Sequence, residues 1–256
     1  MAGGDESSDP YSSRALELLW GNREEAPARG PKRALSVDTI VRTAIGIADA
    51  EGLEAVTMRR VATELGFTTM ALYRYVPHKR SLVDLTVDTV GAAMTDVRLP
   101  PGWRDGLTAW VRAYLDVSSE HPWLLRMEIV GAPAGPNSVA YLEIGLRALD
   151  ESGLPGGDKM AVLLALTGYV RGAAQIASGI SNAASARGVA DEDMAPSYGH
   201  ALAKVVDGER FPRLAEVLTE GVFEMPEEQP DEDFEFGLAR MLDGISVFIE
   251  HRRVGQ

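Results

Sequence analysis

At 256 residues, the chain is long enough for one large domain, or for a small domain together with a larger one. Hydrophobic residues at 45% and charged residues at 25% are ordinary values for a globular protein. The chain has no cysteine, which excludes a disulfide scaffold, a cysteine-ligated zinc site, an iron–sulfur cluster and a thiol nucleophile. Its first ten residues lack the basic and then apolar order of a signal peptide, so we expect a cytoplasmic protein.

The net charge of −13 is unevenly distributed. Residues 32–80 carry eight Lys/Arg against five Asp/Glu, whereas the rest of the chain is strongly acidic. A basic segment in an acidic protein is typical of a small DNA-facing module attached to a larger domain with another role. Charge alone also fits an ordinary solvated surface.

Residues 1–35 are rich in Gly, Ser, Pro and charged side chains, which predicts a flexible N-terminal arm. The run ALELLW at 15–20 predicts one or two helical turns whose apolar side chains dock on the rest of the protein. Arg29, Lys32 and Arg33 stand just before the first regular helix, where a basic segment can lie along the minor groove or the phosphates of DNA. A solvated tail is the alternative, and the sequence leaves both open.

Helical periodicity begins after Ser36, a good N-cap, and predicts a helix that Gly52 ends. Two shorter helices are expected over residues 57–65 and, beginning at residue 68 or 69, as far as Val76. Two short helices joined by a tight glycine turn form a helix-turn-helix, in which the first helix braces the second for entry into a major groove. A plain helical hairpin has the same periodicity.

The third helix would present short or flat side chains, hydroxyls and a guanidinium to DNA, while Leu65 and Leu72 pack the pair of helices together. The outward-facing residues are Thr69, Met70, Ala71, Tyr73, Arg74 and Tyr75. We assign the three helices to a DNA-binding domain over residues 36–82.

Further helical patterns fill the chain after residue 78. They cover residues 79–97, 103–119, 122–130, 139–152, 159–186, 194–206 and 234–251. No alternating pattern of useful length predicts a strand, so the expected fold class is all-α, with a larger helical C-terminal domain over residues 83–256. The segment 160–186 is long enough to cross a bilayer, but its Ala, Gly and Ser content favours a helix buried between protein surfaces.

Particular residues carry a family resemblance. The segments 58–66 (MRRVATELG) and 71–82 (ALYRYVPHKRSL) resemble the signature of TetR-family transcriptional regulators, and the similarity extends back through 48–53 (ADAEGL). In the C-terminal half, residues 121–123 (HPW) and 168–172 (GYVRG) are similar to the ligand-binding domain of the tetracycline-repressor type.

The resemblance implies a homodimer whose two N-terminal heads read a roughly palindromic operator, and whose C-terminal domains dimerise and bind a small effector. It places Arg59 at a guanine-contacting position, and Met58 beside it where the tetracycline repressor has a small hydroxyl residue. The remaining DNA-contacting positions are Thr69, Met70 and Ala71 at base edges, Tyr73, Tyr75 and Lys79 at phosphates, and Arg74 on the DNA side.

Bulky apolar side chains with a few polar groups are the usual composition of a small-molecule site. The candidate effector-binding residues are Trp110, Tyr114, His121, Trp123, Met127, Tyr141, Tyr169 and Gln175, although each aromatic residue also fits an ordinary core position. His121 aligns with an effector- and metal-contacting histidine of the tetracycline repressor. Other polar positions of that pocket are replaced, so we expect a more apolar or aromatic effector than tetracycline.

Two long helices carry surfaces that a monomer of this size would not fully cover, which predicts a four-helix dimer interface. The proposed interface residues are Gly168, Gly172, Gly179, Leu238, Met241, Leu242, Ile245, Phe248 and Ile249.

Two other classes of protein are alternatives. An all-α enzyme is disfavoured because the four histidines lie far apart without metal-ligand spacing, and no nucleophile, base and orienting group form a chain. We therefore expect no catalysis, no cofactor and no metal site. An architectural DNA-binding dimer without a ligand is the other alternative, but the C-terminal half is larger than dimerisation alone requires. The expected function is that of a ligand-responsive repressor. Its three expected partners are an operator duplex, a second copy of the chain and an unknown small molecule. We expect no membrane association.

Overall fold

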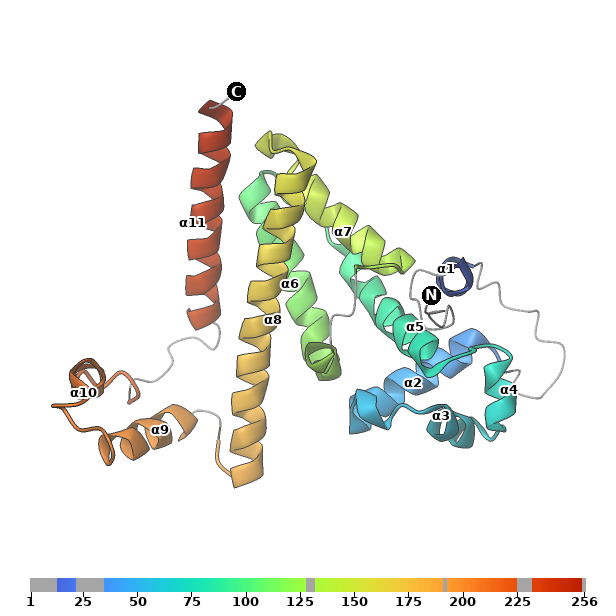
Figure 1. Ribbon diagram of the computed structural model, residues 1–256, viewed down its shortest axis with the longest axis horizontal. Coiled ribbons are helices and arrows are strands. Elements are labelled where there is room, and N and C mark those ends of the chain that lie inside the picture. Colours follow the sequence, from blue (N-terminus) through green and yellow to red (C-terminus); the bar gives the residue numbers. More distant parts are fainter. Residues whose placement is uncertain (1–12, 22–34, 128–131, 191–192, 225–231, 255–256) are drawn as a thin grey trace, which may run out of the picture. The chain divides into compact units, whose positions relative to one another are not determined.

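The computed structural model describes residues 13–21, 35–127, 132–190, 193–224 and 232–254 (Figure 1). Every regular element within these ranges is a helix, which confirms the predicted all-α class.

The described α-helices follow the order of the chain. They are α1 (Ser13–Trp20), α2 (Val37–Glu51), α3 (Met58–Leu65), α4 (Thr69–Tyr73), α5 (Lys79–Gly91), α6 (Trp103–Glu120), α7 (Pro136–Ala148), α8 (Gly156–Arg187), α9 (Met194–Ala203), α10 (Pro212–Thr219) and α11 (Glu232–Val254). Short 3-10 helices are η2 (Leu53–Ala55), η3 (Ala92–Asp96), η4 (Pro122–Arg126) and η5 (Asp150–Ser152).

Three differences from the predicted helices stand out. The segment after His121 forms only the 3-10 turn η4, and residues 128–130 of that prediction lie outside the described residues. The helix expected over 79–97 changes to 3-10 geometry after Gly91. The helix α10 was not predicted, because its eight residues are a short pattern within polar surroundings.

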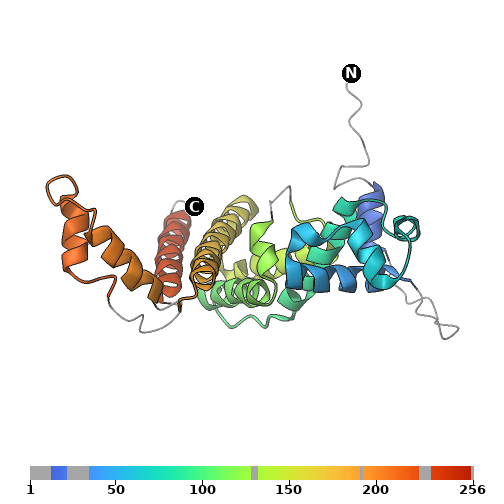
Figure 2. The ribbon, with the colours of Figure 1, turned by 90° about the horizontal axis from the view of Figure 1, so that it is seen from below.

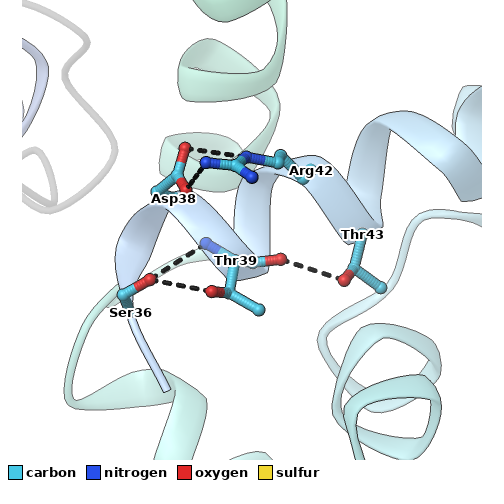
Figure 3. A network of polar contacts seen from close by, with 5 residues as sticks. All are labelled: Ser36, Asp38, Thr39, Arg42 and Thr43. Carbon is cyan, nitrogen blue, oxygen red and sulfur yellow. Dashed lines mark hydrogen bonds and ion pairs between the residues drawn. The ribbon is translucent and has the colours of Figure 1, made fainter. Parts of the chain in front are cut away.

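The first residues of α2 show why the helix starts where it does (Figure 3). The Ser36 hydroxyl accepts a hydrogen bond from the Thr39 amide at 3.1 Å, which satisfies one of the free N–H groups of the first turn. Asp38 in that turn pairs with Arg42 one turn later, and the Thr43 hydroxyl donates to the Thr39 carbonyl at 2.9 Å. The local sequence therefore fixes this helix start without help from distant parts of the chain.

The chain divides into two compact units at residue 167, within α8. In the first unit, α2, α3, α4 and α5 share one core (Figure 2). Its fully buried side chains include Ile40, Val61, Leu72 and Leu85. The division at residue 167 reflects contacts within the chain. The predicted boundaries at residues 35 and 82 separate regions by function, and they stay predictions.

In the second unit, the later part of α8 and the beginning of α11 are joined through Tyr169. Its hydroxyl donates to the Phe234 carbonyl at 2.7 Å, and its ring stacks on that of Phe234 with centroids 5.5 Å apart. Gly237 lies under the Tyr169 ring, and a methyl group there would stand 2.2 Å from the hydroxyl oxygen. Tyr198 and Phe223 pack edge to face beside Gly199.

Among the described residues, α8 is the one helix that is long and apolar enough to cross a membrane by length and composition. In its most apolar stretch, 22% of the residues are buried. A single such helix is weak evidence for a membrane span, because core helices of soluble proteins meet the same criteria. The helix α8 has exposed apolar side chains, which include Leu164, Ile176 and Ile180.

Candidate DNA-binding site

The pair of helices α3 and α4 is defined by an N-cap before each helix and by a glycine in the turn between them. The Thr57 hydroxyl accepts from the Arg60 amide at 3.1 Å and starts α3. Gly66 ends it in the left-handed conformation, at φ 74° and ψ 27°, which costs a side-chain-bearing residue much more than glycine. The Phe67 amide then bonds back to the Ala62 carbonyl at 2.9 Å, so the chain reverses tightly and α4 begins within three residues.

The second helix of the motif is short and is held from beneath. The Thr68 hydroxyl accepts from the Ala71 amide at 3.3 Å, and Leu72 anchors the helix in the core. The helix ends at Tyr73 rather than at the predicted Val76, whose amide still bonds to the Leu72 carbonyl at 2.9 Å. A residue before proline is driven out of helical geometry, which accounts for the looser last turn before Pro77.

The predicted DNA-facing side chains of α4 and its flanks are accessible. Met70 is 76% exposed, an unusual position for a large apolar side chain in the absence of a partner. Tyr73, Arg74, Tyr75, Arg59 and Lys79 are also exposed, whereas Thr69 and Ala71 are half-buried. This arrangement is consistent with the predicted contacts, which stay predictions.

Met58 requires a correction. Its side chain is only 5% exposed and belongs to the core cluster shared by α2, α3 and α5. The family position suggested a DNA contact, but the first turn of α3 points this side chain inward. We remove Met58 from the predicted contact set.

The two arginines at the start of α3 have different electrostatic surroundings. Arg60 pairs with Glu51 at 2.7 Å and also with Glu64, and the hydrogen bond to Glu51 is the main reason that the pKa of Arg60 lies above its ordinary value. Within the described part of the chain, no ion pair engages Arg59. Arg59 therefore keeps its guanidinium available for a base edge, while Arg60 fastens α3 to the end of α2.

Several of the predicted effector-binding residues meet in the first unit. Trp110 and Tyr141 stack with ring centroids 4.7 Å apart. The Trp110 indole donates to the Tyr141 carbonyl at 2.9 Å, and the Tyr141 hydroxyl donates to the Trp110 carbonyl at 2.8 Å. Burial, together with the neighbouring Tyr114, raises the pKa of Tyr141 well above its ordinary value. The two residues thus form a stacked aromatic pair between α6 and α7, in which each side chain donates a hydrogen bond to the other residue's backbone carbonyl.

His121 and Trp123 form a second group, and both bind the DNA-binding domain. The His121 Nδ1 and the Trp123 Nε1 each lie 2.7 Å from the same carboxylate oxygen of Asp49, at the end of α2. Asp49 was not predicted as a site residue. No local pattern marks it, because its partners are more than 70 positions away.

The remaining predicted effector residues are dispersed. Tyr114 and Met127 pack at the edge of the first unit's core. Tyr169 and Gln175 belong to the second unit, where Tyr169 is engaged with Phe234. Among the described residues, no group of three or more His, Asp or Glu side chains is arranged to hold a metal ion.

The predicted interface residues divide by exposure. Gly168 and Gly179 are exposed and Gly172 is half-buried. Leu238, Leu242 and Ile249 are buried by their own chain, so we remove them from the interface set, while Met241, Ile245 and Phe248 keep accessible surface. Periodicity located the apolar stripe but missed the exposed side chains Phe236 and Val247.

Comparison with known proteins now identifies the family. Residues 40–85 match the family described as bacterial regulatory proteins, tetR family, and residues 98–249 match the tetracyclin repressor-like C-terminal domain. The chain belongs to the TetR family. It is a DNA-binding transcriptional regulator and not an enzyme.

Individual TetR-family relatives are similar to this chain over most of its length. The chain is 39% identical to the HTH-type transcriptional repressor DrrR1 of Streptomyces coeruleorubidus, with 94% of this chain and 88% of that protein covered. It is 25% identical to the class A tetracycline repressor from transposon 1721 of Escherichia coli, over 83% of this chain and 91% of the repressor. The structure of the TetR-family protein ActR of Streptomyces coelicolor in complex with actinorhodin superposes with a TM-score of 0.69 at 29% identity, covering 84% of this chain and 99% of ActR.

Proposed function

We propose that this TetR-family regulator is a repressor that binds a palindromic operator as a homodimer and is released by a small, largely apolar or aromatic effector. The observation that carries the proposal is the helix-turn-helix of α3 and α4, whose inner side chains are buried while Arg59, Met70 and Tyr73 are exposed together. The similarity to the repressor DrrR1 supports repression rather than activation.

In this proposal, α4 enters a major groove and α3 braces it from the backbone side. Arg59 reads guanine, Thr69, Met70 and Ala71 approach base edges, and Tyr73, Tyr75 and Lys79 contact phosphates, with Arg74 beside them. Two heads must stand about 34–36 Å apart to dock in successive major grooves on one side of the duplex. Because α5 follows directly after the head, a change in its tilt alters that separation.

The proposed effector site lies in the first unit, around α6 and α7. In the Trp110–Tyr141 pair Trp110 is buried and Tyr141 half-buried, and the two rings give this region its apolar, aromatic character. ActR, which this chain resembles, has been solved with actinorhodin and with (S)-DNPA bound, and this supports a ligand-responsive mechanism. An effector that binds the released form better than the operator-bound form lowers operator affinity by its differential affinity, without any chemical step.

We propose that the exposed apolar side chains of α8 and α11 pair with their symmetry mates in the dimer. Ile176 on α8 is 67% exposed and Val247 on α11 is 51% exposed, which is costly for a monomer in water. Pairing would cover these side chains and account for the membrane-like composition of α8 without a membrane. A cytoplasmic location is part of this proposal, because DNA-binding regulators of the TetR family are cytoplasmic in general.

Selection of bound duplexes from a random-sequence library by the purified full-length protein tests this function. We expect a palindromic consensus whose half-sites are about one helical repeat apart. A panel of planar aromatic compounds is then screened for release of the selected duplex, measured by fluorescence anisotropy. Selection without a consensus contradicts the regulator proposal. A consensus that no compound releases favours an architectural DNA-binding dimer.

A further inference from the structure

The N-terminal helix α1 lies outside the matched family regions, yet it is packed against the helix that leaves the DNA-binding head (Figure 1). Leu19 of α1 is only 6% exposed and is part of the core cluster that includes Leu82 and Leu85 of α5. Leu18 also packs at the edge of this cluster. The helix α1 is therefore docked rather than free.

A polar contact ties the end of α1 to a second element. The Trp20 indole Nε1 donates to the Ala134 carbonyl at 2.7 Å, across 114 positions of sequence. Ala134 directly precedes the entry into α7, so α1 contacts both α5 and the segment that leads into α7.

The same entry segment is fastened to α5 by Asp88. This carboxylate is 2% exposed, and one of its oxygens accepts from the Asn137 amide at 3.1 Å and from the Ser138 amide at 3.0 Å. Gly135 lies so close that an added methyl carbon would stand 2.0 Å from the Asp88 oxygen. The joint between α5 and α7 is thus tightly fitted, and α1 lies across it.

We propose that α1 is an intramolecular strap that holds α5 against the entry of α7, in the orientation of the operator-binding form. An eight-residue helix is too short to be stable alone in water, so α1 is ordered only while it is docked. Undocking is a local event that releases α5 without unfolding the core. Residues 22–34 link α1 to the DNA-binding domain along the chain, and α1 acts on α5 through the buried contact of Leu19.

The proposal rests on the proposed repressor function, and three variants of the full-length dimer test it, one of them a control. Leu19→Glu places a carboxylate at the buried contact and undocks α1, whereas Ser13→Glu adds the same charge at an exposed position of the same helix. Trp20→Phe removes the hydrogen bond to Ala134 and leaves a smaller aromatic ring in place of the indole. Amide hydrogen exchange is measured on the free proteins, and affinity is measured on a duplex selected by the wild type.

With Leu19→Glu we expect faster exchange in α5 and at residues 136–140, and about tenfold weaker binding of the selected duplex. Trp20→Phe should give a smaller change of the same kind, and Ser13→Glu should give neither. Exchange that rises in α1 alone, with α5 unchanged, would overturn the strap. Faster exchange in α5 with unchanged duplex affinity would also overturn it. If the wild type selects no duplex, the repressor proposal fails, while the exchange data still decide whether α1 restrains α5.

Discussion

The Nδ1 atom of His121 lies 2.7 Å from the carboxylate of Asp49, although the two residues are 72 positions apart. His121 ends α6, where the resemblance to the tetracycline repressor suggested an effector contact, and Asp49 lies near the end of α2 in the DNA-binding domain. Trp123 donates to the same carboxylate oxygen at 2.7 Å. The His121 side chain, which was predicted to contact the effector, is therefore hydrogen-bonded to Asp49 of the DNA-binding domain.

This contact predicts energetic coupling between His121 and Asp49. His121→Ala should lower the free energy of unfolding by about 1.5–3 kcal/mol, the usual contribution of a hydrogen bond to a charged group. Asp49→Ala should cost more, because it also removes the acceptor of the Trp123 indole. The double variant should cost less than the sum of the two, because the shared bond is lost only once. Denaturant unfolding of the four proteins measures the cycle.

The matched control is Asp38→Ala, which removes an exposed carboxylate of the same helix that pairs with Arg42. Exposed pairs of this kind contribute about 0–1 kcal/mol, so this variant should remain near wild-type stability. Strictly additive effects of the His121 and Asp49 variants would mean that the 2.7 Å contact carries no stability.

A second prediction concerns Arg59. Its guanidinium is exposed and outside any described ion pair, so Arg59→Ala should weaken the selected operator by about 1–3 kcal/mol and relax the preference at one base pair per half-site. Tyr73→Phe should instead weaken all duplexes alike, since a phosphate contact carries no base information. Anisotropy titrations on operator and on scrambled duplex separate the two. An equal loss on both duplexes for Arg59→Ala would remove the guanine assignment.

The local parts of this site were predictable from sequence, and its long-range parts were not. Caps and turns depend on neighbours within four residues, so Ser36, Thr57 and Gly66 fixed the helix boundaries as observed. Asp49 and Asp88 acquire their roles only when distant segments meet, and no pattern around either residue signals this. For Met58, a family position suggested contact with DNA while the helical face determined burial.

The apolar stripe of α11 shows a similar limit. A period of 3.6 residues identifies the apolar face of a helix, but it does not say whether the same chain or a second copy covers that face. Leu238 and Leu242 are covered within the chain, whereas Val247 is left exposed on the same helix. Only the packed structure separates the two groups.

A third prediction concerns Asp88 of α5, whose carboxylate binds the start of α7. Asp88→Ala should leave the Asn137 and Ser138 amides without their acceptor in a buried place, at a cost of about 1–3 kcal/mol. Gly135→Ala should destabilise through the opposite defect, because its new methyl group meets the Asp88 carboxylate. In the double variant the clash with the carboxylate is gone and only the 2.9 Å approach to the Cβ of residue 88 remains, so the cost of Gly135→Ala should shrink. Thermal unfolding of the three variants measures this, and full additivity would argue against the close fit.

A fourth prediction follows from the raised pKa of Tyr141. The unfolded chain ionises this phenol near its ordinary value of 10.0, while burial keeps it protonated in the folded protein. The unfolded state therefore binds fewer protons above that pH, and Tyr141 makes stability fall as pH rises. Tyr141→Phe should lose about 1 kcal/mol at neutral pH, through the hydrogen bond to the Trp110 carbonyl. Its stability should then decline less steeply than the wild type's above pH 10, as measured by urea unfolding at several pH values. Parallel pH profiles would show that the folded protein ionises Tyr141 normally.

The last prediction concerns the dimer. Ile176 and Val247 are exposed apolar side chains on α8 and α11, so a charge at either position costs an isolated chain almost nothing. In a dimer that buries them, Ile176→Asp or Val247→Asp would place an uncompensated carboxylate in an apolar contact, with a penalty of several kcal/mol. Each variant should fold with wild-type helicity, sediment as a monomer and lose operator binding, although neither position lies in the DNA-binding domain. Glu250→Gln, an exposed change on α11 that adds no charge to the apolar surface, is the control and should remain dimeric. A Val247→Asp protein that sediments as a dimer and binds the operator with wild-type affinity would place the interface on another surface.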